Sequence, residues 1–391
     1  MASASPSPVT GAVDTRRKSD VRNRWRQLWF NFPLRTGYCI LDYLLLAIPA
    51  AFALRYGYHS EPLLSFCAAG IAIVPLAASL GTATAELSAS VGQRLGGMLN
   101  ATLGNATELI LGFFMIRAHQ IEVVKASLSG SIIGNALLVF GMSAVVGGMR
   151  YGKQRLTRHS AQLNSTMLLI ATAALVMPAI FSLSLFGALK THEPRVVLLS
   201  RWTSGILIIL YVIGLAQTLV RRPQTPESIE RSQEPVRSVR SAFGALALTT
   251  ILLSFVSAIL VGQMEQAKHL LHVSDFFMGA VIIAIIGNVA EHASALMMAS
   301  RDRMEAVFAI TVGSSVQIAL LVAPLLVFLS WAFPPGMSLL FSPLEIAGVG
   351  IAVIAVAMIA WDGETTWFEG VQLLAVYLIF AIAIYYMPAG S

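Results

Sequence analysis

Eleven long apolar segments, separated by short polar connections, make up most of this 391-residue sequence. Each segment is long enough to cross the roughly 30 Å hydrocarbon core of a bilayer as an α-helix, which takes about 20 residues. Charged residues account for only 12% of the chain, whereas soluble domains usually carry about 25%. The pattern therefore predicts an all-α polytopic membrane protein and excludes an ordinary soluble globule. The predicted segments are residues 38–57, 63–91, 95–118, 125–148, 162–189, 196–220, 242–262, 275–300, 304–331, 343–361 and 368–387.

The lysine and arginine residues are distributed unevenly between the two sides of such a helical array. If the N-terminus lies in the cytosol, 19 of the 26 basic residues fall on the cytosolic side and 7 on the opposite side. Cytosolic connections of membrane proteins carry this kind of excess, so we expect a cytosolic N-terminus and an external C-terminus. The formal net charge of +6 lies in these connections and does not indicate binding to nucleic acid.

The first 37 residues are rich in Ser, Pro and Ala and then basic, without the apolar stretch that a cleavable signal peptide needs. Within them, residues 22–32 mix arginines with aromatic side chains, which suits a short interfacial helix at an anionic leaflet. A disordered basic tail is the alternative. The two cysteines, Cys39 and Cys67, lie in apolar segments, so we interpret them as free core thiols rather than as disulfide or metal ligands.

The longest polar interruption, residues 221–241, contains three prolines and scattered charges, and we interpret it as a cytosolic linker. It separates the first six apolar segments from the last five. The predicted organisation is a basic cytosolic tail, a peripheral first helix, a first five-helix repeat, the linker, a second five-helix repeat and a short C-terminal tail. The corresponding residues are 1–37, 38–57, 63–220, 221–241, 242–387 and 388–391.

An internal repeat relates the two halves of the chain. A shift of 183 residues aligns residues 104–141 with 287–324 without a gap and produces 13 identities in 38 positions. The identities include a Gly-Asn-x-x-Glu string in both copies, at 104–108 and 287–291, and a Gly-Ser pair later in each copy. The apolar bias of the chain does not explain these polar matches in register.

The two copies begin in the third and eighth apolar segments. Because five segments separate the starting points, an odd number of crossings gives the copies opposite polarity in the membrane. Inverted repeats are typical of secondary transporters, whose substrate site lies near the midplane at the repeat interface. We therefore expect one peripheral first helix followed by two inverted five-helix repeats.

Each Gly-Asn-x-x-Glu string places a carboxylate in the middle of an apolar helix. An ionised acid at a helix centre costs roughly 2.5–3.5 kcal/mol on insertion scales, so such acids are rarely without function. Asn105 and Glu108 are three residues apart, as are Asn288 and Glu291. Residues at this spacing share a helix face, so each helix offers a carboxylate and an amide oxygen in the same direction.

The glycines that precede these pairs, Gly104 and Gly287, would loosen each helix and expose backbone carbonyls. At this depth, such backbone is tolerated only where it lines a cavity. Two carboxylates with neutral oxygens suit a dehydrated Ca²⁺, which takes 6–8 oxygen ligands, whereas softer metals favour His or Cys. His292 is the nearby imidazole, and we interpret it as a core histidine. The following segments add Ser131, Asn135, Ser314, Ser315 and Gln317.

Without a cation, the two acids would repel each other in a cavity of low dielectric constant. Burial and like charge both disfavour the ionised form of a carboxyl group. The low-energy cycle is then protonation of the empty site and deprotonation when a cation binds, which predicts proton-coupled cation exchange. A buried hydrogen-bond network between helices is the structural alternative, but one Asn or Ser would serve that purpose at lower energetic cost.

Three further acids are candidates for a peripheral role. Glu86 lies near the end of the second segment, where it could serve a proton or cation path or be an interfacial acid at the helix end. Glu122 and Glu305 match in the repeat and begin the fourth and ninth segments. A role in a vestibule and a favourable interaction with the helix dipole are both consistent with that position.

Four motifs make segments two to eleven resemble the calcium/proton exchangers of the calcium/cation antiporter superfamily. Many members carry a strongly acidic stretch between the two halves, whereas residues 221–240 contain three glutamates and five arginines. The motifs are Gly-Asn-Ala-Thr-Glu-Leu-Ile at 104–110, Gly-Asn-Val-Ala-Glu-His at 287–292, Gly-Ser-Ser-Val-Gln-Ile-Ala-Leu at 313–320, and the ending Trp-Phe-Glu-Gly…Leu-Ala-Val-Tyr within 367–377.

This resemblance implies eleven helices, with the first one peripheral, and alternating access by the sliding of a gating bundle. It implies that Glu108 and Glu291 are the exchanging carboxylates and the Ca²⁺ ligands. Ca²⁺ and H⁺ would be transported substrates, with no cofactor. The side chains that it implies around the site are Asn105, Asn288, Ser131, Ser314 and Gln317.

The leading prediction is a Ca²⁺/H⁺ antiporter that exports Ca²⁺ from the cytosol. Proton-coupled exchange of Mn²⁺, Na⁺ or K⁺ is the close alternative, and a cation channel is a more distant one. We expect no enzymatic activity, because the sequence lacks a His-Glu-x-x-His zinc motif and a phosphate-binding Gly-Lys-Ser/Thr loop. The short tails favour a prokaryotic plasma membrane, and no feature of the sequence assigns an oligomeric state.

Overall fold

Nearly all of the described residues are helical in the computed structural model. The predicted N-terminal tail apart from Leu34, most of the linker and the predicted C-terminal tail lie outside the described residues. The interfacial helix considered for residues 22–32 is among the parts that lie outside. The structure describes residue 34 and residues 39–57, 61–91, 93–191, 193–220 and 238–387.

Nine helices in the described part of the chain are long and apolar enough to cross a membrane. Six of them are single α-helices, and each begins and ends within a few residues of a predicted segment, apart from one C-terminal extension. These six are α4 (Pro62–Ser90), α9 (Arg158–Phe186), α10 (Pro194–Val220), α12 (Val239–Leu271), α17 (Pro343–Asp362) and α18 (Trp367–Tyr385).

The other three long helices contain a π-helical turn. Such turns are rare and are found frequently at functional sites. The first is α7 (Ile121–Ile133), η3 (Gly134–Val139) and α8 (Phe140–Tyr151); the second is α13 (Asp275–Phe277), η5 (Met278–Ile283) and α14 (Ala284–Ala299); the third is α15 (Met304–Gln317), η6 (Ile318–Val322), α16 (Ala323–Leu329) and η7 (Ser330–Ala332).

Two of the eleven predicted segments consist of shorter helices. The first segment is a chain of four short pieces, and the third is broken after Leu103. At the break, Asn105 has φ −102° and ψ 29°, which is outside the helical region, and α6 begins at the next residue. The pieces are α2 (Cys39–Tyr43), η1 (Leu44–Leu46), α3 (Ala47–Phe52) and η2 (Ala53–Gly57), followed further on by α5 (Gln93–Leu103) and α6 (Ala106–Arg117).

Two details differ from the sequence-based expectations. The helix predicted at 242–262 extends to Leu271, since Glu265 and Lys268 form an ion pair three residues apart that supports its last turns. The helix predicted to loosen at Gly287 is intact there, so only Gly104 marks a break.

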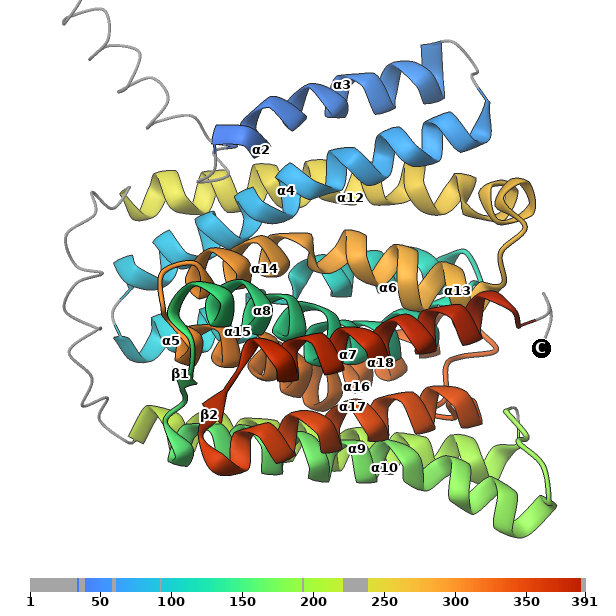
Figure 1. The fold of residues 1–391 in the computed structure, drawn as a ribbon. Helices are drawn as coiled ribbons and strands as arrows, with labels where there is room; N and C mark the ends of the chain where they lie inside the picture. Colours follow the sequence, from blue (N-terminus) through green and yellow to red (C-terminus); the bar gives the residue numbers. More distant parts are fainter. Residues whose placement is uncertain are drawn as a thin grey trace, which may run out of the picture.

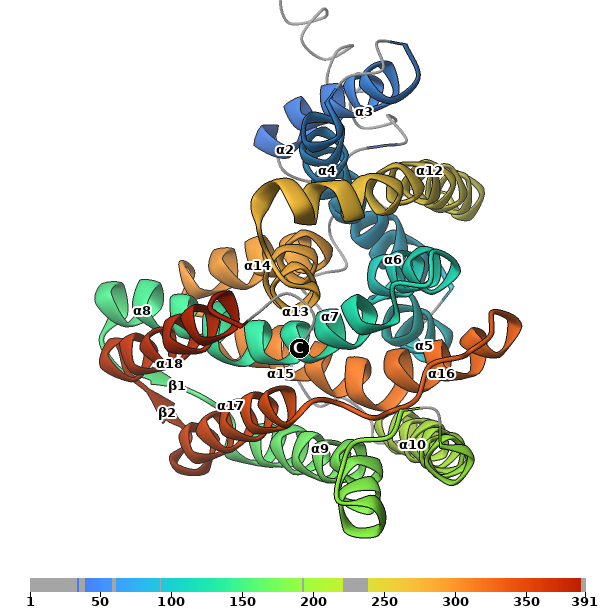
Figure 2. The same cartoon turned by 90° about the vertical axis from the view of Figure 1, so that its right-hand side faces the viewer.

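The helices pack side by side in one bundle. α4 lies along α12, and α2 and α3 cover α4 from outside (Figure 1). α7 and α15 lie in the middle of the bundle when it is viewed end-on (Figure 2). Their spans have the largest buried share of the nine. The repeat segments that carry the Gly-Ser pairs therefore form the centre of the molecule.

The bundle has two distinct ends. At one end, which we call the α13 end, α6 passes into α7 and α12 passes into α13. At the other end, the β-ribbon end, β1 (Gln154–Arg155) pairs antiparallel with β2 (Glu364–Thr365). α6 runs toward the α13 end and α14 runs away from it (Figure 1), so the two acid-bearing helices are antiparallel as the odd segment count predicts.

The outer helices expose large apolar side chains to their surroundings. On α10, for example, Trp202, Ile206, Ile209 and Ile213 are all at least 60% exposed. Side chains of this kind on long apolar helices face lipid, so the chain is a multi-pass integral membrane protein. Cys67 is exposed on α4 rather than buried in the core, which corrects the expectation for this thiol.

Candidate cation-exchange site

The two acid–amide pairs lie on helices of different character. Asn105 is the N-cap of α6, and Glu108 is in the first turn of this helix. Asn288 and Glu291 lie one turn apart within the continuous α14. Both asparagines are buried. The helix break at Gly104 therefore places Glu108 near a helix N-terminus, whose dipole favours negative charge.

The amide nitrogens of both asparagines are used in contacts between the repeats. Asn288 Nδ2 donates to Ser131 Oγ on α7 at 2.8 Å and to the Ala284 carbonyl oxygen at 2.8 Å. Asn105 Nδ2 donates to Gln317 Oε1 on α15. Each asparagine is thus oriented by the central helix of the other repeat, which leaves its amide oxygen for another partner.

Four buried oxygens of the two pairs have no hydrogen-bond partner within the described part of the chain. They are Asn105 Oδ1, Glu108 Oε2, Asn288 Oδ1 and Glu291 Oε2, one from each predicted residue. Buried polar atoms in native proteins are normally paired. All four atoms are hydrogen-bond acceptors when the acids are ionised, and a cation or a proton would satisfy them. Ca²⁺ takes 6–8 oxygens of this kind, including carboxylate and amide oxygens.

The two carboxylates interact electrostatically. Both have a buried Oε2 atom, and negative charges on Glu108 and Glu291 repel each other. Ser314 Oγ donates to Glu291 Oε1 at 2.8 Å, which joins α15 to α14. No group of three or more His, Cys, Asp and Glu side chains suited to a metal occurs among the described residues. The oxygens beyond the two acids must therefore come from amides, hydroxyls, backbone or water.

Six of the seven predicted site residues form three hydrogen-bonded pairs across helices, and Glu108 interacts electrostatically with Glu291. The three peripheral acids lie near helix ends. Glu86 is on the last turns of α4. Glu122 and Glu305 are in the first turns of α7 and α15, as the sequence predicts. Each of the two lines a cavity, Glu122 at the α13 end and Glu305 at the β-ribbon end.

The cavity at the α13 end, which we call the vestibule, has a volume of about 310 Å³. Its equivalent at the β-ribbon end measures about 270 Å³, and there Thr157 Oγ1 donates to Glu305 Oε2 at 2.8 Å. The two equivalent acids of the repeat thus mark cavities at opposite ends of the bundle. The residues around the vestibule are His119, Gln120, Ile121, Glu122, Lys125, Thr191, Asp275, Pro335, Gly336 and Ser338.

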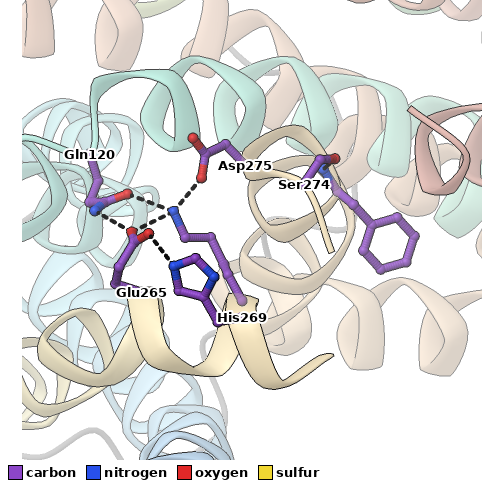
Figure 3. Close-up of polar contacts among 7 residues, drawn as sticks. Gln120, Glu265, His269, Ser274 and Asp275 are labelled. Atoms are coloured by element: carbon purple, nitrogen blue, oxygen red, sulfur yellow. Dashed lines mark hydrogen bonds and ion pairs between the residues drawn. The ribbon is translucent and has the colours of Figure 1, made fainter. Parts of the chain in front are cut away.

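A cluster of polar side chains borders the vestibule and was not predicted from the sequence. Lys268 Nζ lies 2.6 Å from Glu265 Oε2, donates to Gln120 Oε1 at 3.3 Å and contacts Asp275 Oδ1 (Figure 3). Gln120 Nε2 donates to Glu265 Oε2 at 3.0 Å. The cluster joins the end of α12 to the start of α13 and to the N-cap of α7.

Two further buried ionisable residues, Lys125 and Glu345, were also missed. Lys125 was expected at a segment boundary, but α7 begins at Ile121 and the lysine is buried within it. Glu345 is buried in the first turn of α17. Two local signals were available: a Glu-x-x-Lys spacing in α7 and a Ser-x-x-Glu capping box before α17.

The fold and the paired acids define a membrane exchanger built from inverted repeats. A family model described as sodium/calcium exchanger protein matches residues 61–220 and 241–386. A Ca²⁺/H⁺ antiporter of Synechocystis sp. is 38% identical over 361 residues, which cover 88% of this chain and 96% of the relative. The Ca²⁺/H⁺ antiporter ChaA of Bacillus subtilis is 40% identical over 321 residues, which cover 81% and 90%.

The solved structure of native YfkE is similar to this chain, with a TM-score of 0.77 and 36% identity. The match covers 89% of this chain and 100% of YfkE. This chain therefore belongs to the calcium/proton exchangers of the calcium/cation antiporter superfamily, which confirms the resemblance predicted from its motifs.

Proposed function

We propose that this protein is a secondary active Ca²⁺/H⁺ antiporter. The observation that carries the proposal is the set of four buried, unpartnered oxygens, contributed equally by the two inverted copies. The names of the similar antiporters support Ca²⁺ and H⁺ as the exchanged ions. Glu108 and Glu291 would bind either Ca²⁺ or protons, with Asn105 and Asn288 as further Ca²⁺ ligands.

Exchange follows from the electrostatics of the two carboxylates. Two ionised acids side by side in a region of low dielectric constant are unfavourable unless a cation neutralises them. Ca²⁺ supplies two positive charges when both acids are ionised, and protons supply the charge when Ca²⁺ leaves. Because the same oxygens serve both ions, the occupied states exclude each other, and Ca²⁺ and protons would move in opposite directions.

The second part of the proposal concerns access to the site. The gating bundle implied by the family resemblance corresponds to α4 and α12, which pack along each other over their length. These helices also contact α14 and α6, respectively, the helices that carry the two acids. Sliding of this pair would alternate access to the carboxylates from the two ends. Ca²⁺ export would then take place across a prokaryotic plasma membrane, with the N-terminus in the cytosol. The two repeats would be residues 63–220 and 242–387.

Purified protein in liposomes with an imposed pH gradient tests this function. We expect Ca²⁺ accumulation that depends on the gradient and is accompanied by proton movement in the opposite direction. Gradient-driven flux of Mn²⁺, Na⁺ or K⁺ without Ca²⁺ flux would contradict the choice of cation. Ca²⁺ flux without proton counter-movement would instead indicate a channel.

The two carboxylates are tested by Glu108→Gln and Glu291→Gln. Each variant replaces one ionisable carboxyl group with a neutral amide of nearly the same size. We therefore expect Ca²⁺ uptake to fall to the level of empty liposomes. The matched control is Glu61→Gln, which alters an exposed acid that precedes α4. Gel filtration and thermal unfolding verify that the variants are folded. Near-normal exchange in either site variant would contradict the two-carboxylate mechanism.

A further inference from the structure

Glu345 is a buried carboxylate in a membrane-spanning helix, outside the two acid–amide pairs. It lies in the first turn of α17 and is 4% exposed. It lies beyond residues 287–324, the part of the second copy that aligns with the first. A buried carboxylate needs compensating contacts because an isolated buried charge is strongly unfavourable.

Two hydrogen bonds and one ammonium group compensate this carboxylate. Glu345 Oε2 accepts from the backbone N–H of Ser342 at 2.7 Å, which completes a capping box at the start of α17. Glu345 Oε1 accepts from Ser129 Oγ on α7 at 3.1 Å. Lys125, one turn before Ser129, is close enough for Coulomb attraction. Glu345 therefore links the second repeat to the central helix of the first.

Lys125 connects this buried site to the vestibule. The side chain is only 3% exposed, yet it lines the vestibule together with Glu122, which is 62% exposed. Lys125 Nζ lies 2.7 Å from Glu122 Oε2 and donates to the Leu340 carbonyl oxygen at 3.0 Å. Lys125 thus joins Glu122 at the vestibule to the segment that precedes α17.

A small cavity of about 20 Å³ borders Glu345. Its polar lining consists of Glu345, Ser129 and Thr172, and the remaining lining is apolar apart from backbone. Thr172 Oγ1 is buried and has no hydrogen-bond partner among the described residues. A buried water needs roughly 10–15 Å³ and two to four polar partners. The cavity has the volume for one water, but its lining surface is almost entirely apolar, so it adds to the apolar surroundings of Glu345.

Burial of Glu345 favours its protonated form, and the few oxygens around it do not suit Ca²⁺. Lys125 and the two hydrogen bonds favour the ionised form instead, while solvent screens the charge of Glu122, which is 62% exposed. Neutral groups are favoured in a region of low dielectric constant. Ca²⁺ needs 6–8 oxygen ligands, whereas this site has a single carboxylate. One of its oxygens already accepts a hydrogen bond from a backbone N–H. The positive charge of Lys125 would also repel a cation.

We propose that Glu345 is a proton-binding site, distinct from Glu108 and Glu291, that exchanges its proton with the vestibule. A role of Glu345 in coupling proton movement to Ca²⁺ transport rests on the proposed exchange function, whereas proton binding by Glu345 does not. The charged group that faces it from α7 is Lys125, with Glu122 beyond. The lining residues of the small cavity from α9 and α16 include no ionisable side chain, and Asp275 and His119 lie on the vestibule wall.

Infrared spectroscopy of the full-length protein in Ca²⁺-free buffer tests this proposal. A protonated buried carboxyl group has a C=O stretching band distinct from that of a carboxylate. In the Glu108→Gln/Glu291→Gln background, which removes the central acids, we expect such a band to appear as the pH is lowered. Adding Glu345→Gln should abolish it. Adding Lys125→Met should move its appearance to higher pH, because the neighbouring positive charge is lost.

The matched control is Glu369→Gln in the same background. Glu369 forms the same kind of capping box at the start of α18, with Oε2 accepting from the Thr366 backbone N–H at 2.7 Å, but it is only half-buried. The buried carboxyl band should persist in this control. An absent band in the double variant, or an unchanged band after Glu345→Gln, would overturn the proposal.

A transport measurement then separates this proposal from the proposed function. In liposomes, Glu345→Gln in the otherwise native chain should change the pH dependence of Ca²⁺ uptake and leave the Ca²⁺ affinity unchanged, because the central oxygens remain. A purely structural role predicts a uniform loss of rate at every pH. If the native protein shows no Ca²⁺/H⁺ exchange while the infrared band behaves as described, the exchange function fails and the proton site stands.

Discussion

Ser131 and Ser314 occupy equivalent positions in the two repeat copies but make different contacts. Ser314 Oγ donates to Glu291 Oε1, whereas Ser131 Oγ accepts a hydrogen bond from the amide of Asn288. Hydrogen bonds to charged groups contribute about 1.5–3 kcal/mol and neutral ones about 0.5–1.5 kcal/mol. The two serines therefore contribute unequally to the site, although each follows a glycine at an equivalent position of the repeat.

We expect Ser314→Ala to weaken Ca²⁺ binding by roughly tenfold or more, because it removes a donor that stabilises the ionised form of Glu291. Ser131→Ala removes only a neutral contact and should weaken binding by less than about tenfold. Isothermal titration calorimetry of both variants at one pH provides the measurement. Equal losses in the two variants would show that the observed difference in contacts has no energetic consequence.

At the level of helices, the repeat is less symmetric than its sequence. α7 and η5 cross closely near the α13 end: a Cβ atom on Gly130 would lie 2.3 Å from the backbone oxygen of Ala280. Gly313, the equivalent of Gly130, has no atom within 4 Å of the corresponding position. Gly130 therefore lies at a close helix crossing, whereas the space around the equivalent Gly313 is open.

This difference predicts opposite outcomes for two equivalent substitutions. Gly130→Ala forces α7 away from η5 and should lower the free energy of unfolding by about 1–3 kcal/mol, as overpacking typically does. Gly313→Ala has room for the added methyl group and should leave stability nearly unchanged. Thermal unfolding of both variants in the same detergent measures the effect. A larger loss for Gly313→Ala would contradict the packing described here.

The Lys268 cluster connects helices that the proposed gating motion would separate. Lys268→Met removes the group that joins the end of α12 to Asp275 and Gln120. We expect faster hydrogen–deuterium exchange in residues 265–278, because the end of α12 and the start of α13 lose the lysine that joins them. The control is Lys153→Met, which breaks an exposed ion pair with Glu364 at the β-ribbon end. Exposed pairs contribute little, so a comparable effect in the control would contradict the prediction.

At the scale of the whole molecule, the orientation in the membrane follows from the distribution of basic residues. The proposal places the α13 end outside the cell and the β-ribbon end in the cytosol. In a variant without Cys39 and Cys67, we expect Glu61→Cys to react with a membrane-impermeant maleimide in intact cells. Lys153→Cys, which is on an exposed side chain at the β-ribbon end, should react only after permeabilisation. The reverse labelling pattern would contradict the proposed orientation.

Much of this architecture could be predicted from the sequence because its causes are local. Runs of apolar residues define membrane helices wherever they occur, and the nine long helices match predicted segments closely. The offset of 183 residues and the odd number of crossings predict antiparallel acid-bearing helices, and α6 and α14 are antiparallel. Both inferences need only hydrophobicity and counting, which do not depend on packing.

Other features depend on packing between distant residues. The break at Gly104 and the intact helix at Gly287 arise in nearly identical strings, so the surroundings of each helix decide between them. The contacts of Lys268 with Gln120 and of Glu345 with Ser129 join residues 148 and 216 positions apart. No local pattern indicates which partner a buried charge will find at such distances.

The sequence by itself determined the class of protein, the inverted repeat and the two acid–amide pairs, because an acid in an apolar helix has a large cost wherever the helix packs. Only the tertiary structure decided which oxygens remain without partners and which crossing is tight. It also decided that Glu345 is hydrogen-bonded to Ser129 on α7. These features depend on small differences in position between groups on separate helices, and such differences arise only when the helices are packed together.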